Sequence, residues 1–197
     1  MIKRLTPCAL LLTLAACPGS DGGTGPEEVV SSVRFSHPAA GAILPAGAYE
    51  AVGEVRFGGQ GQLLPGEWAF GMVGMPPGFV VRVTASQRSA IVNGRYDVVA
   101  MEVPGDIPAG GTAALAVVCN GAPACAQVHV SLGMRTQGNV SPQVTCTLSN
   151  GTVTVTARSA TRIRGTFAGS GTCYGSAGNA PYQVTGGTFD VPVLEWG

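Results

Sequence analysis

The sequence predicts an all-β protein with an antiparallel β-sandwich, and three observations support this fold class. From residue 29 onwards, short apolar or alternating runs are separated by Gly, Pro and Asn, as is typical of antiparallel strands. No window of eleven residues keeps a 3.6-residue apolar period without an interrupting Gly or Pro, so no helix is expected. The apolar fraction of 45% argues against disorder, although 30 of the 197 residues are Gly and only 11% are charged.

Eleven strands are expected along the chain. They are residues 30–36, 49–57, 67–73, 79–85, 96–103, 113–119, 127–133, 144–148, 152–158, 163–168 and 182–193. Alternation is clearest near the C-terminus, where Val153 and Val155 alternate with threonines, which predicts one buried and one solvated face. Gly186 and Gly187 break the alternation of the last strand and predict a bulge, while Pro192 predicts that this strand lies at a sheet edge.

The first sixteen residues have the three parts of a secretory signal peptide. Lys3 and Arg4 provide a basic start, residues 5–16 form a 12-residue apolar stretch, and small residues precede Cys17. A membrane-spanning helix needs about 20 apolar residues, so this stretch is too short to be one. The sequence Leu-Ala-Ala-Cys at residues 14–17 resembles the lipobox of bacterial lipoproteins.

That resemblance implies that cleavage precedes Cys17 and that this cysteine receives lipid. It also implies outer-membrane localisation, because the next residue is Pro18 rather than the aspartate that favours retention in the inner membrane. Residues 18–28 have no large apolar side chain and predict a flexible tether with a reach of roughly 18 Å. An ordinary secretory signal without lipidation is the alternative.

Two further segments resemble known families. Residues 96–98 (YDV), followed by residues 103–111 (VPGDIPAGG), resemble a bacterial immunoglobulin-like module that covers residues 29–136. Residues 152–155 (TVTV), 162–167 (RIRGTF) and 187–192 (GTFDVP) resemble the end of small, uncharacterised β-rich bacterial lipoproteins, a family that implies no function.

The expected domains are therefore a signal peptide (1–16), a lipid anchor and tether (17–28), an immunoglobulin-like sandwich (29–136) and a C-terminal β module (137–197). The alternative is one continuous sandwich over residues 29–197. Gly-Thr-Phe occurs at residues 165–167 and again at 187–189, through a duplicated hairpin or through chance in a region rich in Gly and Thr.

Four cysteines follow Cys17, and an even number outside the cytoplasm predicts disulfides. Cys119 and Cys125 flank a turn-rich loop, so a hairpin would place them opposite each other. Cys146 lies on the same face of its predicted strand, 144–148, as the apolar residues of that strand. Cys173 lies on the apolar face of the strand 163–168 if the chain stays extended beyond residue 168. We therefore predict the pairs Cys119–Cys125 and Cys146–Cys173. A zinc site built from the same four residues lacks the short C-x2-C spacing of zinc knuckles.

No catalytic residue, metal site or cofactor is predicted. Nucleotide-binding loops, the G-x-S-x-G elbow and the H-E-x-x-H motif do not occur. His37 precedes Pro38 in an expected turn, where we predict an exposed side chain, and His129 lies in a solvent-facing row with its strand neighbours. Asp97 and Glu102 lie on opposite faces of their strand by parity, so they cannot form the carboxylate pair of a glycosidase.

The charge of the mature chain argues against nucleic acid as a partner. Without Lys3 and Arg4, nine arginines and no lysine stand against eleven acidic residues, a net charge of −2. No arginine cluster is present that could follow a row of phosphates.

An apolar connection and a terminal tryptophan are the candidate interaction features. Met72, Met75 and Phe79 belong to the connection, and Trp196 lies next to the C-terminus. Exposed, these side chains would contact a glycan or a second envelope protein. Buried, they would close the end of the core.

The sequence thus predicts a non-enzymatic β-sandwich of the bacterial cell envelope, attached to the membrane through its N-terminal lipid. It would act as a binding or structural module. The alternative is an envelope hydrolase that acts on a polysaccharide or a peptide.

Overall fold

The computed structural model describes residues 30–56, 66–73, 80–119, 122, 124–135 and 141–194. Strands account for the regular structure of this part of the chain, which confirms the all-β class. The ten strands are β1 (Ser32–His37), β2 (Gly47–Val52), β3 (Trp68–Val73), β4 (Val80–Arg88), β5 (Tyr96–Pro104), β6 (Thr112–Leu115), β7 (Cys125–Met134), β8 (Val144–Arg158), β9 (Arg162–Gly175) and β10 (Gly178–Leu194). No helix in the described ranges is long and apolar enough to cross a membrane.

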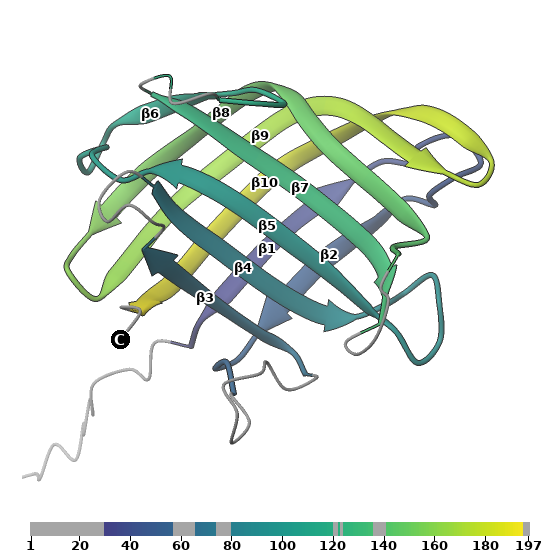
Figure 1. Cartoon of the computed structure of the whole chain (residues 1–197), viewed down its shortest axis with the longest axis horizontal. Coiled ribbons are helices and arrows are strands. Elements are labelled where there is room, and N and C mark those ends of the chain that lie inside the picture. The colour runs from purple at the N-terminus through teal and green to yellow at the C-terminus, as the bar shows by residue number, and fades with distance from the viewer. Residues whose placement is uncertain are drawn as a thin grey trace, which may run out of the picture.

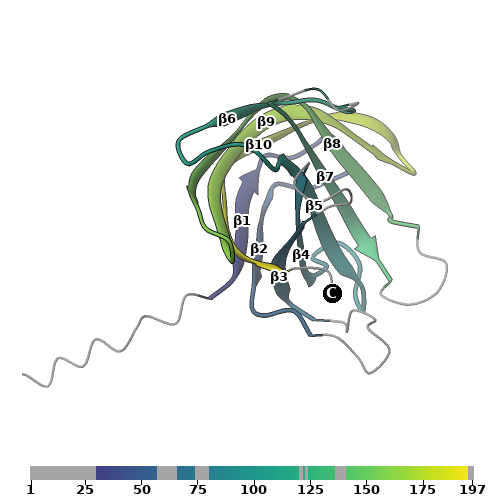
Figure 2. The same ribbon diagram turned by 60° about the vertical axis from the view of Figure 1, so that its left-hand side comes forward.

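All ten strands belong to one sheet, and its hydrogen bonding closes on itself. On one side, β10 pairs with β9. Continuing from β9, each strand pairs with the next in the order β9, β8, β7, β5, β4 and β3. The end of β10 then pairs in parallel with β3, where Val193 lies opposite Gly71, and this contact completes the ring. Figures 1 and 2 show the resulting sheet curled around an enclosed interior.

The two separate sheets of an immunoglobulin-like sandwich are therefore not confirmed. The predicted strands 144–148 and 152–158 continue into each other as β8, with a register shift next to Gly151, whose φ is +134°. β8, β9 and β10 contain 15, 14 and 17 residues, so each is about 45–55 Å long at 3.3 Å per residue. Strands of this length follow the natural twist of the sheet and coil around the core. They therefore join the two layers of the expected sandwich into one continuous sheet.

The enclosed face of the sheet forms the hydrophobic core. Alternate residues of most strands point inward, as the sequence alternation predicts, and their side chains are almost completely buried, whereas β3 is buried on both faces from Trp68 to Gly71. Examples from six strands are Val33, Val83, Met101, Val130, Val153 and Phe189. β1 pairs with β10 and β7 pairs with β8, so strands from residues 29–136 and from residues 137–197 share this sheet and this core.

β10 is a central strand, and the prediction that Pro192 marks an edge strand is wrong. The Val193 amide donates to Thr161 O on the β9 side, so the nitrogen of Pro192 faces the other side of β10. There the partner changes from β1, which pairs as far as Asp190, to β3, which pairs from Val193 onwards. A proline is tolerated because no partner needs its missing N–H at this change. The predicted bulge at Gly186 is confirmed by a register shift and a φ of +62°.

Four connections meet at one end of the sheet, which we call the loop end. They are residues 38–46 after β1, 89–95 between β4 and β5, the described residues 135 and 141–143 between β7 and β8, and 176–177 between β9 and β10. β1 runs toward this end, because Ser32 pairs with Asp190 whereas Ser36 pairs with Thr185, nearer to the β9–β10 turn. The start of β1 therefore lies away from the loop end.

Candidate functional site

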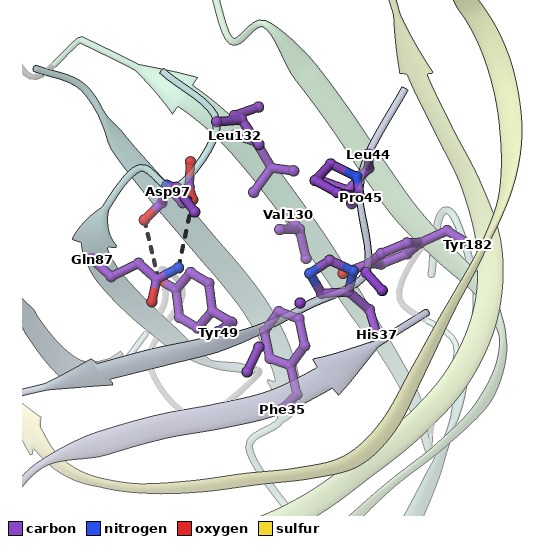
Figure 3. Close-up of a pocket in the computed structure, with 15 residues that line it drawn as sticks. Phe35, His37, Leu44, Pro45, Tyr49, Gln87, Asp97, Val130, Leu132 and Tyr182 are labelled. Carbon is purple, nitrogen blue, oxygen red and sulfur yellow. Dashed lines mark hydrogen bonds between the residues drawn. The ribbon is translucent and has the colours of Figure 1, made fainter. Parts of the chain in front are cut away.

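A cavity of about 60 Å³ lies at the loop end, between the end of β1 and the turn between β4 and β5. Figure 3 shows its lining, which combines apolar walls with a few polar groups. The polar side chains are His37, Tyr49, Gln87, Asp97 and Tyr182. Mostly apolar walls with a few convergent polar groups are typical of small-molecule sites in proteins.

Residues 38–46 cover the cavity as a folded turn. Ala40 and Leu44 are 1% and 3% exposed, and the Ala40 amide donates to Leu44 O at 2.8 Å. Phe35 and Tyr49 form the neighbouring wall as a stacked pair with their ring centroids 4.9 Å apart. The apolar contacts of Leu44 with the core hold this turn against the sheet.

Tyr182 places a hydroxyl at the cavity without a hydrogen-bond partner among the described residues. Its side chain is only 3% exposed. Burial, and to a smaller extent the charge of Asp97, raise the pKa of Tyr182 well above its usual value, so the hydroxyl is neutral and can still donate. An unpartnered buried hydroxyl is costly, and a bound molecule that pairs with it would recover that free energy.

His37 lies next to Tyr182 in the cavity wall, with the ring centroids 5.6 Å apart. The prediction of an exposed side chain is wrong, because the residue is half-buried against Phe35 and Tyr182. Nδ1 lies 3.2 Å from Pro38 O, and since a carbonyl oxygen only accepts, Nδ1 donates in this contact.

Asp97 on β5 is 2% exposed, and its carboxylate accepts hydrogen bonds from β7, from β4 and from the turn between β4 and β5. The Gly133 amide donates to its Oδ1 at 2.8 Å, while the Ala90 amide and Gln87 Nε2 donate to its Oδ2 at 3.3 Å and 3.5 Å. The Tyr49 hydroxyl donates to the backbone oxygen of Asp97 at 3.2 Å. Both carboxylate oxygens are thus engaged in holding the loops together.

Glu102 lies on the other face of β5, where it forms an ion pair with Arg82. The prediction that Asp97 and Glu102 face opposite sides is therefore confirmed. Asp97 is the one carboxylate among the described residues that line the cavity. This lining does not provide the two facing carboxylates of a glycosidase.

A groove of about 600 Å³ lies on the surface of the same end. Its described lining is Arg95, Arg135, Ser141, Pro142, Gln143, Tyr174, Gly175 and Ser176, with no acidic side chain. Arg95 Nη1 donates to Gly133 O at 2.8 Å, so Gly133 connects the groove to the Asp97 network. Tyr174 is 51% exposed beside the two arginines.

Both predicted disulfides are present. Cys119 and Cys125 close the loop between β6 and β7 with a Cα–Cα distance of 5.6 Å. Cys146 and Cys173 lie opposite each other on β8 and β9, and both are fully buried. The condition for this second pair is met, since β9 stays extended as far as Gly175.

The other predicted site residues are only partly covered by the structure. Met72 is half-buried near the end of β3. Cys17, Met75, Phe79 and Trp196 lie outside the described residues, so the lipid anchor and the interaction loop stay predictions.

His129 lies on the outer face of β7 in the predicted polar row. Its Nδ1 is 3.1 Å from Thr147 Oγ1, and its Nε2 is 3.3 Å from the side-chain amide of Gln127. In the described part of the chain, no group of three or more His, Cys, Asp or Glu side chains could hold a metal ion.

Sequence reasoning did not find the residues that the loop end brings together. Tyr182 comes from β10, Tyr49 from β2, and Arg95 and Arg135 from the ends of two other connections. The inward parity of Tyr182 with Val184 was visible as a local signal. No known protein family, curated protein or solved structure matches the chain.

Proposed function

We propose that the protein is a non-enzymatic, lipid-anchored binding module of the bacterial cell envelope, with its loop end as the binding end. The observation that carries this proposal is the direction of β1. The tether joins the sheet where β1 begins, whereas His37 at the end of β1 lines the cavity. An anchor at Cys17 would therefore hold the start of β1 near the membrane and direct the loop end away from it.

The geometry of the loop end supports binding. A closed sheet with a dense core provides a rigid frame, and rigid frames reduce the entropy that a binding site loses when it takes up a ligand. The cavity offers an unpartnered hydroxyl, and the groove offers two arginines and an exposed aromatic ring. Both carboxylate oxygens of Asp97 already accept hydrogen bonds, which favours a structural role for this residue over general-base catalysis.

The anchor is tested by mass spectrometry of the mature N-terminus and by membrane fractionation. We expect acyl chains on Cys17 of the natural chain and its recovery with membranes. Cys17→Ser should abolish both while leaving the two disulfides intact. An unmodified thiol at the mature N-terminus would refute the anchor.

The orientation is tested with two matched cysteine variants, Ala160→Cys and Ala177→Cys. Both alanines are exposed and lie in hairpin turns, Ala160 between β8 and β9 and Ala177 between β9 and β10 at the loop end. Each variant would carry a thiol-linked dye on lipidated protein in vesicles that contain a lipid-phase quencher. We expect stronger quenching at residue 160, and equal or reversed quenching would contradict the orientation.

A further inference from the structure

We propose that the groove at the loop end binds an acidic saccharide, with the carboxylate at Arg95 and Arg135 and a sugar ring on Tyr174. The inference names a ligand class for the proposed binding end and rests on that function. Three connections and one strand end form its walls: the end of the β4–β5 turn, the two ends of the β7–β8 connection, the β9–β10 turn, and the end of β9.

Charge is the first argument. In the described part of the chain, Arg34, Arg82, Arg88, Arg162 and Arg164 each have a carboxylate within 4.0 Å. Arg95, Arg135, Arg56 and Arg158 form no ion pair there; of these four, Arg95 and Arg135 line the groove together, and no described residue of the groove is acidic. Two uncompensated cations in a concave surface attract an anion, although the mature chain as a whole carries a net charge of −2.

Preorganisation is the second argument. Arg95 is half-buried, and Nη1 is held by Gly133 O at 2.8 Å. The Gly133 amide in turn donates a hydrogen bond to Asp97 Oδ1, which holds Gly133 in place. The remaining N–H groups of the guanidinium can form the paired hydrogen bonds that arginine makes to carboxylates. The loss of side-chain entropy on binding is reduced because the side chain is already held.

The neutral part of the groove selects the rest of the ligand. Tyr174 presents half of its surface to solvent, and a tyrosine combines a flat apolar face with a polar tip. Ser141, Gln143 and Ser176 supply hydroxyl and amide groups suited to sugar hydroxyls. An isolated phosphate or carboxylate would use the arginines alone, so the aromatic ring and the neutral polar groups favour a saccharide.

The experiment is calorimetric titration of the detergent-solubilised, lipidated full chain with a trigalacturonate probe. Maltotriose serves as the neutral probe of similar size, and inorganic phosphate serves as the bare anion. We expect trigalacturonate to bind, with an affinity that falls as salt is added, and maltotriose to give no heat. Equal affinity for trigalacturonate and phosphate would reduce the groove to a general anion site and overturn the proposal.

Three variants assign the binding to the groove. Arg135→Gln should weaken trigalacturonate binding at least tenfold, and Tyr174→Ala at least fivefold. Arg158→Gln is the matched control, since Arg158 ends β8 at the opposite end of the sheet, and it should leave binding unchanged. Thermal unfolding of each variant confirms that the fold is intact.

Unchanged binding in Arg135→Gln or in Tyr174→Ala would overturn the assignment. Absence of any trigalacturonate binding by the natural chain would refute the ligand class. This outcome is independent of the anchor, because acylation and vesicle orientation are measured without a saccharide.

Discussion

The ring of Phe189 occupies the space over Gly165 on the neighbouring strand. A Cβ atom placed on Gly165 would clash with Phe189 Cζ and with Thr154 O. The relationship is reciprocal, because Gly187 lies opposite Phe167 and its Cβ would lie 2.8 Å from that ring. The two Gly-Thr-Phe sequences thus face each other across β9 and β10, with each phenylalanine covering the glycine of the other.

Gly165→Ala should therefore lower the free energy of unfolding by about 2–3 kcal/mol, as overpacking of a core does. The added methyl group meets both a buried ring and a backbone oxygen, and the oxygen cannot move without disturbing β8. Urea unfolding would measure the change. Gly47→Ala is the control, because its Cβ would meet His37 Nε2 at an ordinary 3.4 Å. A loss in Gly165→Ala no larger than in the control would contradict the packing argument.

Asp97→Ala should cost about 3 kcal/mol of stability. The substitution removes the acceptor of the buried Gly133 amide, and also that of the partly buried hydrogen bonds from the Ala90 amide and the Gln87 side chain. Glu102→Ala, on the outer face of the same strand, should cost less than about 1 kcal/mol, because its ion pair with Arg82 is partly solvated. Equal losses in the two variants, measured by denaturant unfolding, would show that the Asp97 network does not hold the loop end.

The two disulfides should stabilise the fold by different amounts. On the chain-entropy argument, the Cys146–Cys173 bond contributes about 3.5 kcal/mol and the shorter Cys119–Cys125 loop about 2.4 kcal/mol. Double replacement of each pair by alanine, followed by guanidinium unfolding, measures both. The larger loss should come from Cys146 and Cys173, which are also fully buried in the core. A larger loss from Cys119 and Cys125 would contradict this order.

Stability should fall as the pH rises above about 10. Burial, followed by the charge of Asp97, raises the pKa values of Tyr49 and Tyr182 well above the usual value near 10. Above pH 10 the unfolded chain releases these protons while the folded protein keeps them, so the free energy of unfolding decreases with pH. Below pH 10 both states keep them, and the contribution is constant.

Tyr182→Phe tests this pH dependence. The variant removes one of the two buried hydroxyls, so its stability should fall less steeply between about pH 10 and 11.5 than that of the natural chain. Urea unfolding at each pH gives the slope. Tyrosine absorbance in the near ultraviolet would show whether the buried hydroxyls resist titration in the folded protein. Identical slopes for the two proteins would contradict the assignment to Tyr182.

Local features of the fold could be predicted from the sequence. The alternation of Val153 and Val155 with threonines predicts inward and outward faces, because side chains of a strand alternate whatever it pairs with. The same parity led to the Cys146–Cys173 pair, and the double glycine led to the bulge in β10. Each of these inferences needs only a few consecutive residues.

The pairing of distant strands was not visible in this way. Pro192 indicated an edge strand because proline lacks an N–H, yet β10 changes its partner from β1 to β3 at that residue. Parity also says nothing about how far a strand continues, so the merging of two predicted segments into β8 was missed, and with it the single closed sheet.

By itself the sequence determined the all-β class, the inward faces of the strands and the cysteine pairs. Only the tertiary structure decided that the sheet closes and that Asp97, Tyr182, Arg95, Arg135 and Tyr174 meet at one end. The physical reason is the range of the interactions. The alternation of apolar and polar residues indicates whether a side chain faces water or the core, and it depends only on neighbouring residues. The closure of a sheet depends on the twist of all its strands and on the register between strands that are far apart in the chain.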